Sequence, residues 1–89
     1  MLTLEDFRAA RDLLSGILLN TSLVYSPYFS KSSGNQVYLK PENLQLTGAY
    51  KVRGACFKIS TLSDEEKARG LVTASAGNHA QGVAFAARN

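Results

Sequence analysis

The chain contains few cysteine, histidine and proline residues and no tryptophan. Its 89 residues include one cysteine, Cys56, one histidine, His79, and two prolines. A single cysteine cannot form an internal disulfide, and no cluster of cysteine and histidine ligands surrounds it. We therefore expect no metal site, and a reducing compartment such as the cytoplasm.

Long apolar runs and stripes of like charge are also missing. No apolar run approaches the ~20 residues of a membrane helix. The start, residues 1–6, carries acids where a secretory signal carries basic residues. Ten basic and seven acidic residues give a net charge of +3, and the basic ones are spread from Arg8 to Arg88. These patterns disfavour membrane insertion, secretion and nucleic-acid binding.

The first part of the chain predicts one helix and two short strands. Thr3, followed by an acid in the first turn, is an N-cap signal, and apolar residues recur at helical spacing over residues 7–18. Residues 23–25 and 37–39 are short, β-prone and followed by proline, which predicts strands. The polar residues 30–35 predict a turn between them.

The second part alternates helices with an apolar strand. We expect a helix over about residues 50–62, then a short helix capped at Ser63 that ends near Gly70. The apolar residues 71–74 predict a strand, and residues 78–88 predict a helix. This order indicates an α/β fold with parallel strand pairing and flanking helices. Because no strand follows to cover the last helix, we expect an incomplete sheet and a truncated chain.

Lys51 lies beside Tyr50, between Gly48 and Gly54, near a predicted helix start. The positive end of the helix dipole disfavours an ammonium group, and burial disfavours it further, so a neutral nucleophilic amine becomes accessible. Such a lysine suits a Schiff base with an aldehyde cofactor. Without this context, a lysine is most often a solvated surface charge.

Residues 75–82 form a second compact polar segment, at a predicted junction between a strand and a helix. Ligands gather beyond the carboxyl ends of strands in open α/β sheets, and the amides of a helix start bind carboxylates or phosphates. Ser75 and Asn78 offer side-chain hydrogen bonds, and Gly77 permits a tight turn. Spacing alone favours an ordinary N-cap here, and a lone His79 is more often structural than catalytic.

The two motifs together resemble a known family. The sequence VYLKPENLQ at residues 37–45, followed by TGAYK at 47–51, resembles the lysine segment of threonine dehydratases, and SAGNHAQG at 75–82 resembles their asparagine loop. These are pyridoxal-phosphate enzymes of the tryptophan-synthase-β type, or fold type II. The similarity runs from about residue 4 to residue 89, and the ordered pair is more specific than either motif alone.

The resemblance implies roles for the site residues. Lys51 would hold pyridoxal 5'-phosphate as a Schiff base and remove the α-proton of the substrate, with Tyr50 beside the cofactor. Asn78 would hydrogen-bond the 3'-oxygen of the cofactor, and Ser75, Ala76, Gly77 and Asn78 would bind the substrate carboxylate. L-threonine would yield 2-oxobutanoate and ammonia, and L-serine is a second candidate substrate.

The resemblance also implies a larger protein. Residues 1–62 would begin a large cofactor-binding domain and residues 63–89 a small one, in an enzyme that is a homo-oligomer. The glycine-rich phosphate loop of the family is absent from these 89 residues, so we expect the chain alone to be inactive. Two alternatives stay open, namely a serine racemase or serine dehydratase of the same family, and a non-catalytic fragment. Racemases of this family carry serine where this chain has Ala76, which favours elimination.

Overall fold

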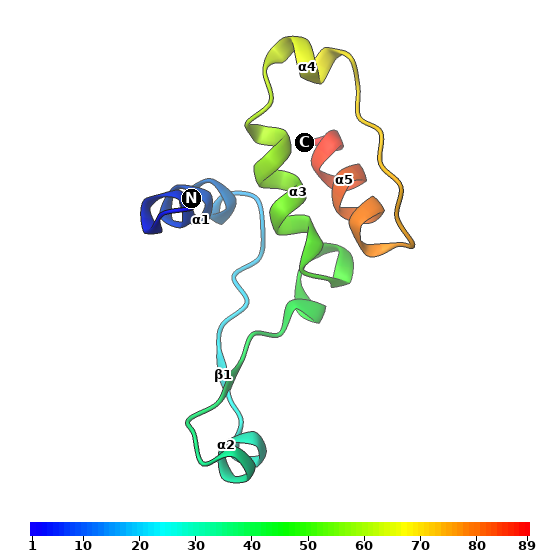
Figure 1. The fold of residues 1–89 in the computed structure, drawn as a ribbon. Coiled ribbons are helices and arrows are strands. Elements are labelled where there is room, and N and C mark those ends of the chain that lie inside the picture. The colour runs from blue at the N-terminus through cyan, green and yellow to red at the C-terminus, as the bar shows by residue number, and fades with distance from the viewer.

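The computed structural model describes residues 1–89 and is mainly helical. Figure 1 shows helices α3 and α5 side by side, α1 to one side of α3, and an arm of β1, α2 and β2 that projects away. The elements in order are α1 (Leu4–Ser15), β1 (Val24–Tyr25), α2 (Pro27–Ser33), β2 (Tyr38–Leu39), the 3₁₀ turns η1 (Glu42–Leu44) and η2 (Leu46–Gly48), α3 (Lys51–Ser60), α4 (Asp64–Ala68) and α5 (Asn78–Arg88).

Both helix starts that were predicted from capping signals are confirmed. The Thr3 side chain accepts a hydrogen bond from the Asp6 amide, and the Asp6 carboxylate accepts one from the Thr3 amide at 2.7 Å. Ser63 and Glu66 form the same reciprocal pair at the start of α4. These hydrogen bonds satisfy amides that a helix start leaves without partners, so the sequence signal alone locates both starts.

The two short strands are confirmed, but the predicted parallel pairing is wrong. Val24 of β1 lies opposite Leu39 of β2, and Tyr25 lies opposite Tyr38, in an antiparallel pair. The chain turns back through α2 between them, and the rings of Tyr25 and Tyr38 meet edge to face at 5.4 Å. A parallel pair would require a crossover that returns the chain to the starting end of the first strand.

The predicted turn at residues 30–35 is largely helix. Pro27 opens α2 instead of only closing the preceding strand, because proline is already set to a helical φ and a helix start needs no partner for its nitrogen. Ser26 caps the helix by accepting from the Phe29 amide. The helix ends at Gly34, whose φ of 72° is left-handed and favours glycine. The polar run is therefore helical up to Ser33 and turns only at Gly34.

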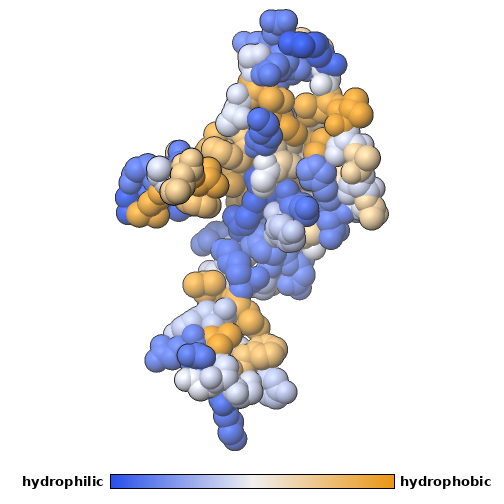
Figure 2. Space-filling model, viewed as in Figure 1, coloured by the Kyte–Doolittle hydropathy of each residue, from blue (hydrophilic) through white to orange (hydrophobic).

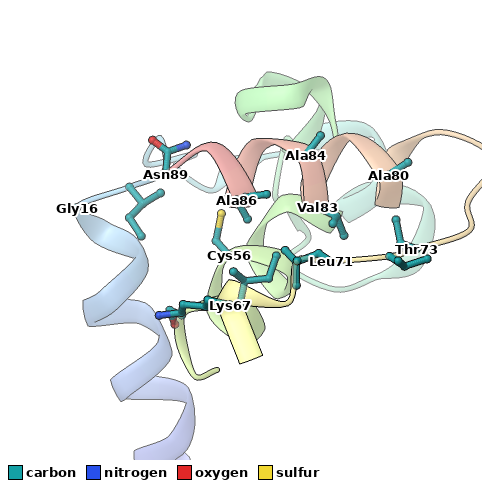
Figure 3. Close-up of a pocket in the computed structure, with 16 residues that line it drawn as sticks. Gly16, Cys56, Lys67, Leu71, Thr73, Ala80, Val83, Ala84, Ala86 and Asn89 are labelled. Atoms are coloured by element: carbon teal, nitrogen blue, oxygen red, sulfur yellow. The ribbon is translucent and has the colours of Figure 1, made fainter. Parts of the chain in front are cut away.

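The predicted strand at residues 71–74 has no strand beside it. This stretch between α4 and α5 is extended in Figure 1, but the only strand pair in the structure is β1 with β2. Together with α3 and α5, residues 70–73 line a cavity of about 990 Å³ (Figure 3). The apolar run thus gave the right local conformation and the wrong element, because a strand requires a hydrogen-bonded neighbour.

A small core joins α1, α3 and α5. Its buried members are Leu14, Val52, Ala55, Cys56 and Ala86. Only 11 of the 89 residues are buried, and apolar side chains are exposed on the arm (Figure 2), so most of the packing energy lies between α3 and α5. None of the helices has the length and apolar character that crossing a membrane would require.

Candidate active site

Helices α3 and α5 pack in the same direction, with their N-terminal ends together. Gly82 of α5 lies against the backbone of Val52 in the first turn of α3. One turn later on α5, Ala86 joins the buried cluster that contains Ala55 and Cys56. This order means that the helix starts share one end, as Figure 1 shows. The positive ends of two helix dipoles therefore lie together.

Lys51 and Asn78, the two residues expected to act on the cofactor, are the first residues of these helices. Two segments that are well separated in the sequence are thus brought to one end of one helix pair. The loop at residues 75–77 leads directly into α5 at the same end. The tertiary structure therefore groups the sequence-predicted site residues, although they come from different motifs.

The Lys51 side chain is exposed, so the predicted burial of its amine is wrong for this chain. The prediction that it lies at a helix start is confirmed. Its Nζ atom lies 5.7 Å from the centre of the Tyr50 ring, within the range of a cation–π contact. Tyr50 is itself 60% exposed. The amine and the aromatic ring thus form one accessible surface.

The loop before α5 does not form the ordinary N-cap that spacing alone favoured. The Ser75 hydroxyl accepts a hydrogen bond from the Gly77 amide at 3.1 Å, and no side chain caps α5. Helix α3 also lacks a side-chain cap, whereas α1, α2 and α4 are each capped by a serine or threonine. The first amides of α5 therefore point to an open end, where they can bind an anion.

Sequence reasoning missed a partly buried ion pair that anchors the first turn of α3. The Nε and Nη2 atoms of Arg53 each lie 2.8 Å from one oxygen of Glu42. The Thr21 hydroxyl donates to the same carboxylate at 2.6 Å, and the Lys40 amine donates to the Thr21 carbonyl. This network ties the chain on both sides of the arm to a residue next to the lysine turn, and no short-range pattern links residues so far apart.

Thr47, four residues before Lys51, has an unusual conformation. Its φ of 68° is left-handed, and Gly48 follows with a φ of 74°. A β-branched residue in this region costs roughly 1–3 kcal/mol and marks turns whose surroundings hold them in place. Its hydroxyl is buried without a hydrogen-bond partner. Because threonine disfavours this conformation, nothing in the sequence predicts it.

The largest cavity contains none of the predicted site residues. It lies between residues 70–73 and the apolar sides of α3 and α5, and Figure 3 shows Cys56, Val83 and Ala86 around it. The candidate site is instead the open surface at the shared helix starts. Its definition therefore depends on chemistry and geometry, and the size of a cavity is no guide to it.

Glu42 is the acid with the strongest electrostatic stabilisation in the chain. The hydrogen bonds from Arg53 lower the pKa of the Glu42 carboxyl from 4.5 to about 2, partial burial opposes this, and the Thr21 hydroxyl and the charges of Arg53 and Lys40 lower it further. The carboxylate is therefore more stable in the folded than in the unfolded chain. Stability from this group is fully present above about pH 4.5 and is lost as the pH falls toward 2.

We expect Glu42→Gln to lower the free energy of unfolding of the full-length protein by about 1–3 kcal/mol at pH 7. The difference between variant and wild type should shrink as the pH falls below about 4.5. Urea unfolding at a series of pH values measures both. The control is Glu65→Gln, since Glu65 and Arg69 form an exposed pair at 3.4 Å that should contribute little. A constant difference at every pH would contradict the assignment.

Three comparisons place this geometry among known proteins. The sequence profile described as pyridoxal-phosphate dependent enzyme matches residues 14–89. The L-threonine ammonia-lyase of Thermotoga maritima is 54% identical over 88 residues, which cover 99% of this chain and 22% of that protein.

Two solved structures superpose on nearly the whole chain. A serine racemase from Dictyostelium discoideum has a TM-score of 0.87 and 37% identity, and covers 98% of this chain. A threonine deaminase from the organism abbreviated T.th. has a TM-score of 0.79 and 39% identity, again over 98%. The chain spans 28% and 31% of these two proteins. By profile, sequence and fold, the chain belongs to the family of pyridoxal-phosphate dependent enzymes.

Proposed function

We propose that this chain is the N-terminal segment of a threonine dehydratase that deaminates L-threonine to 2-oxobutanoate and ammonia, and that also accepts L-serine. The observation that carries the proposal is the position of Lys51 and Asn78 as the first residues of two parallel, packed helices. The names of the Thermotoga and T.th. relatives support the substrate class.

The residues at the shared helix starts fit pyridoxal phosphate. Lys51 presents an accessible amine for its aldehyde, and the ring of Tyr50 lies within contact distance of that amine. Asn78 carries an amide that can donate to the oxygen of the cofactor ring. Pyridoxal phosphate, when bound, supplies an electron-withdrawing ring that acidifies the α-carbon of an amino acid. In this proposal Lys51 holds the cofactor, with Asn78 and Tyr50 beside it.

The remaining roles belong to the protein groups. The amine of Lys51 takes the proton from the substrate α-carbon, as a general base positioned at a helix start. The amides of residues 75–78 bind the substrate carboxylate, because the uncapped start of α5 favours an anion. The ion pair of Glu42 and Arg53 holds the first turn of α3, so that Lys51 keeps its position during the reaction.

The wider organisation follows as part of the same proposal. Residues 1–62 belong to the large domain and residues 63–89 to the small one, so that α3 and α5 meet where the two domains join. The enzyme is cytoplasmic and homo-oligomeric, and acts on small amino acids without binding nucleic acid. Its role is either isoleucine biosynthesis or threonine catabolism.

A serine racemase or serine dehydratase is the second candidate. The high TM-score of the Dictyostelium racemase favours it. The position of Ala76 argues against racemisation, because its methyl group can neither donate nor accept a proton. A non-catalytic fragment is the third possibility, and it predicts that the chain neither binds the cofactor nor reacts.

The test is to incubate the full-length protein and the isolated residues 1–89 with pyridoxal phosphate and L-threonine. We expect the full-length protein to release 2-oxobutanoate and ammonia in equal amounts, and the isolated chain to release neither. L-serine in place of L-threonine should yield pyruvate. A full-length protein that binds the cofactor but releases no oxo acid from either substrate would contradict the proposal, and one that binds no cofactor would favour the non-catalytic alternative.

A further inference from the structure

Helix α5 reaches its closest approach to α3 at Gly82. A Cβ atom at this position would lie 3.1 Å from both Cα and N of Val52, and 3.3 Å from the carbonyl carbon of Lys51. These distances are shorter than ordinary van der Waals contact, and all three atoms belong to the backbone. Gly82 is also buried, and Val52 is fully buried. The neighbouring chain therefore cannot relieve the contact by a change of side-chain rotamer.

Glycine at this position disfavours the helix unless packing requires it. Glycine in a helix interior is less favourable than alanine, and α5 is otherwise rich in alanine, at Ala80, Ala84, Ala86 and Ala87. The only glycine inside α5 is the residue that touches the backbone of α3. Close packing at this point thus accounts for a residue that local helix preference disfavours.

The position of this contact connects the two halves of the site. Gly82 lies one helical turn after Asn78, and it touches the peptide that joins Lys51 to Val52. Any increase in the spacing between the helices at Gly82 therefore moves the start of α5 away from the start of α3. The same movement separates Lys51 from the loop at residues 75–78.

We propose that Gly82 is a positioning residue, whose missing side chain lets α5 approach the Lys51–Val52 peptide and thereby sets the separation of Lys51 from the loop at residues 75–78. This inference rests on the proposed function, since that function requires both groups to act on one bound molecule. Gly82 itself touches neither cofactor nor substrate. It acts through the packing of two helices.

The test uses the full-length enzyme with Gly82→Ala. The added methyl group forces the helices apart by a few tenths of an ångström, so we expect kcat for L-threonine to fall roughly tenfold, given that a 1 Å misplacement can cost about 100-fold. Cofactor affinity should weaken and the pH profile of kcat should shift, because the surroundings of the Lys51 amine change. The melting temperature should stay within about 4 °C of the wild type.

Two further variants separate positioning from simple packing. Gly16→Ala adds the same methyl group at a site with no atom within 4 Å, and it should match the wild type in every measurement. Gly82→Ala combined with Ala86→Gly keeps the volume of the helix interface but moves the glycine one turn away from Lys51. We expect this double variant to fold with a wild-type melting temperature and to retain the low kcat, weak cofactor binding and shifted pH profile.

Each outcome decides the proposal. A Gly82→Ala enzyme with unchanged kcat, cofactor affinity and pH profile would overturn it, whatever its melting temperature. If Gly82→Ala does not fold, the double variant takes over the test, and full recovery of kcat together with folding would also overturn it. A wild-type enzyme without lyase activity counts against the proposed function, whereas an active wild type with an unaffected Gly82→Ala counts against the role of Gly82 alone.

Discussion

The Lys51→Ala enzyme is expected to lose the visible absorbance of the bound cofactor and to show a kcat for L-threonine lower by roughly 1,000-fold or more. The loss is large because one amine both holds the cofactor and takes the substrate proton. Lys51 is the first residue of α3, where its exposed Nζ atom lies beside the Tyr50 ring. Absorbance after purification and steady-state release of 2-oxobutanoate measure the two losses separately.

The matched control is Lys58→Ala. Lys58 is an exposed lysine in the last turn of the same helix, so its removal changes the charge equally without touching the site. This variant should retain both absorbance and activity. Borohydride reduction of the wild type, followed by peptide mapping, should place the pyridoxyl label on Lys51. A label that persists on another lysine in the Lys51→Ala enzyme would remove Lys51 from this role.

The Ala76→Ser enzyme is expected to release a larger share of D-serine from L-serine than the wild type, which should form mainly pyruvate. Racemisation requires a proton-transferring group on each face of the substrate α-carbon. Lys51 serves one face in the proposed site. Ala76 lies in the exposed loop before α5, and its methyl group can transfer no proton, whereas a serine hydroxyl can.

Following D-serine and pyruvate together gives the ratio directly. The control is Ala84→Ser, the same substitution at an exposed position on α5 outside the loop, and it should leave the ratio unchanged. An unaltered ratio in Ala76→Ser would mean that this position does not control the second face. A wild-type enzyme that forms D-serine as fast as pyruvate would instead favour the racemase alternative.

Local signals in the sequence were sufficient for several elements. The caps at Thr3 and Ser63 located two helix starts, because capping joins a side chain to an amide only three residues away. The short β-prone runs gave β1 and β2, and the motif around Lys51 gave the start of α3. The paired motifs also gave the family, which the profile match over residues 14–89 confirms.

Contacts between distant residues were beyond local signals. The antiparallel pairing depends on how the chain turns through α2, and residues 71–74 have the composition of a strand without a neighbour to pair with. The exposure of Lys51 depends on which segments surround it. The alternating pattern described local conformation correctly, but it held no information on which segments meet.

The sequence by itself determined the family, the chemical groups and the helix starts on which Lys51 and Asn78 lie. Only the tertiary structure decided that these helices run in parallel with their starts together, because Gly82 permits an approach that any side chain would block. It also decided the left-handed turn at Thr47 and the pairing of Glu42 with Arg53. Each of these features arises from packing between segments far apart in the chain, where propensity has no influence.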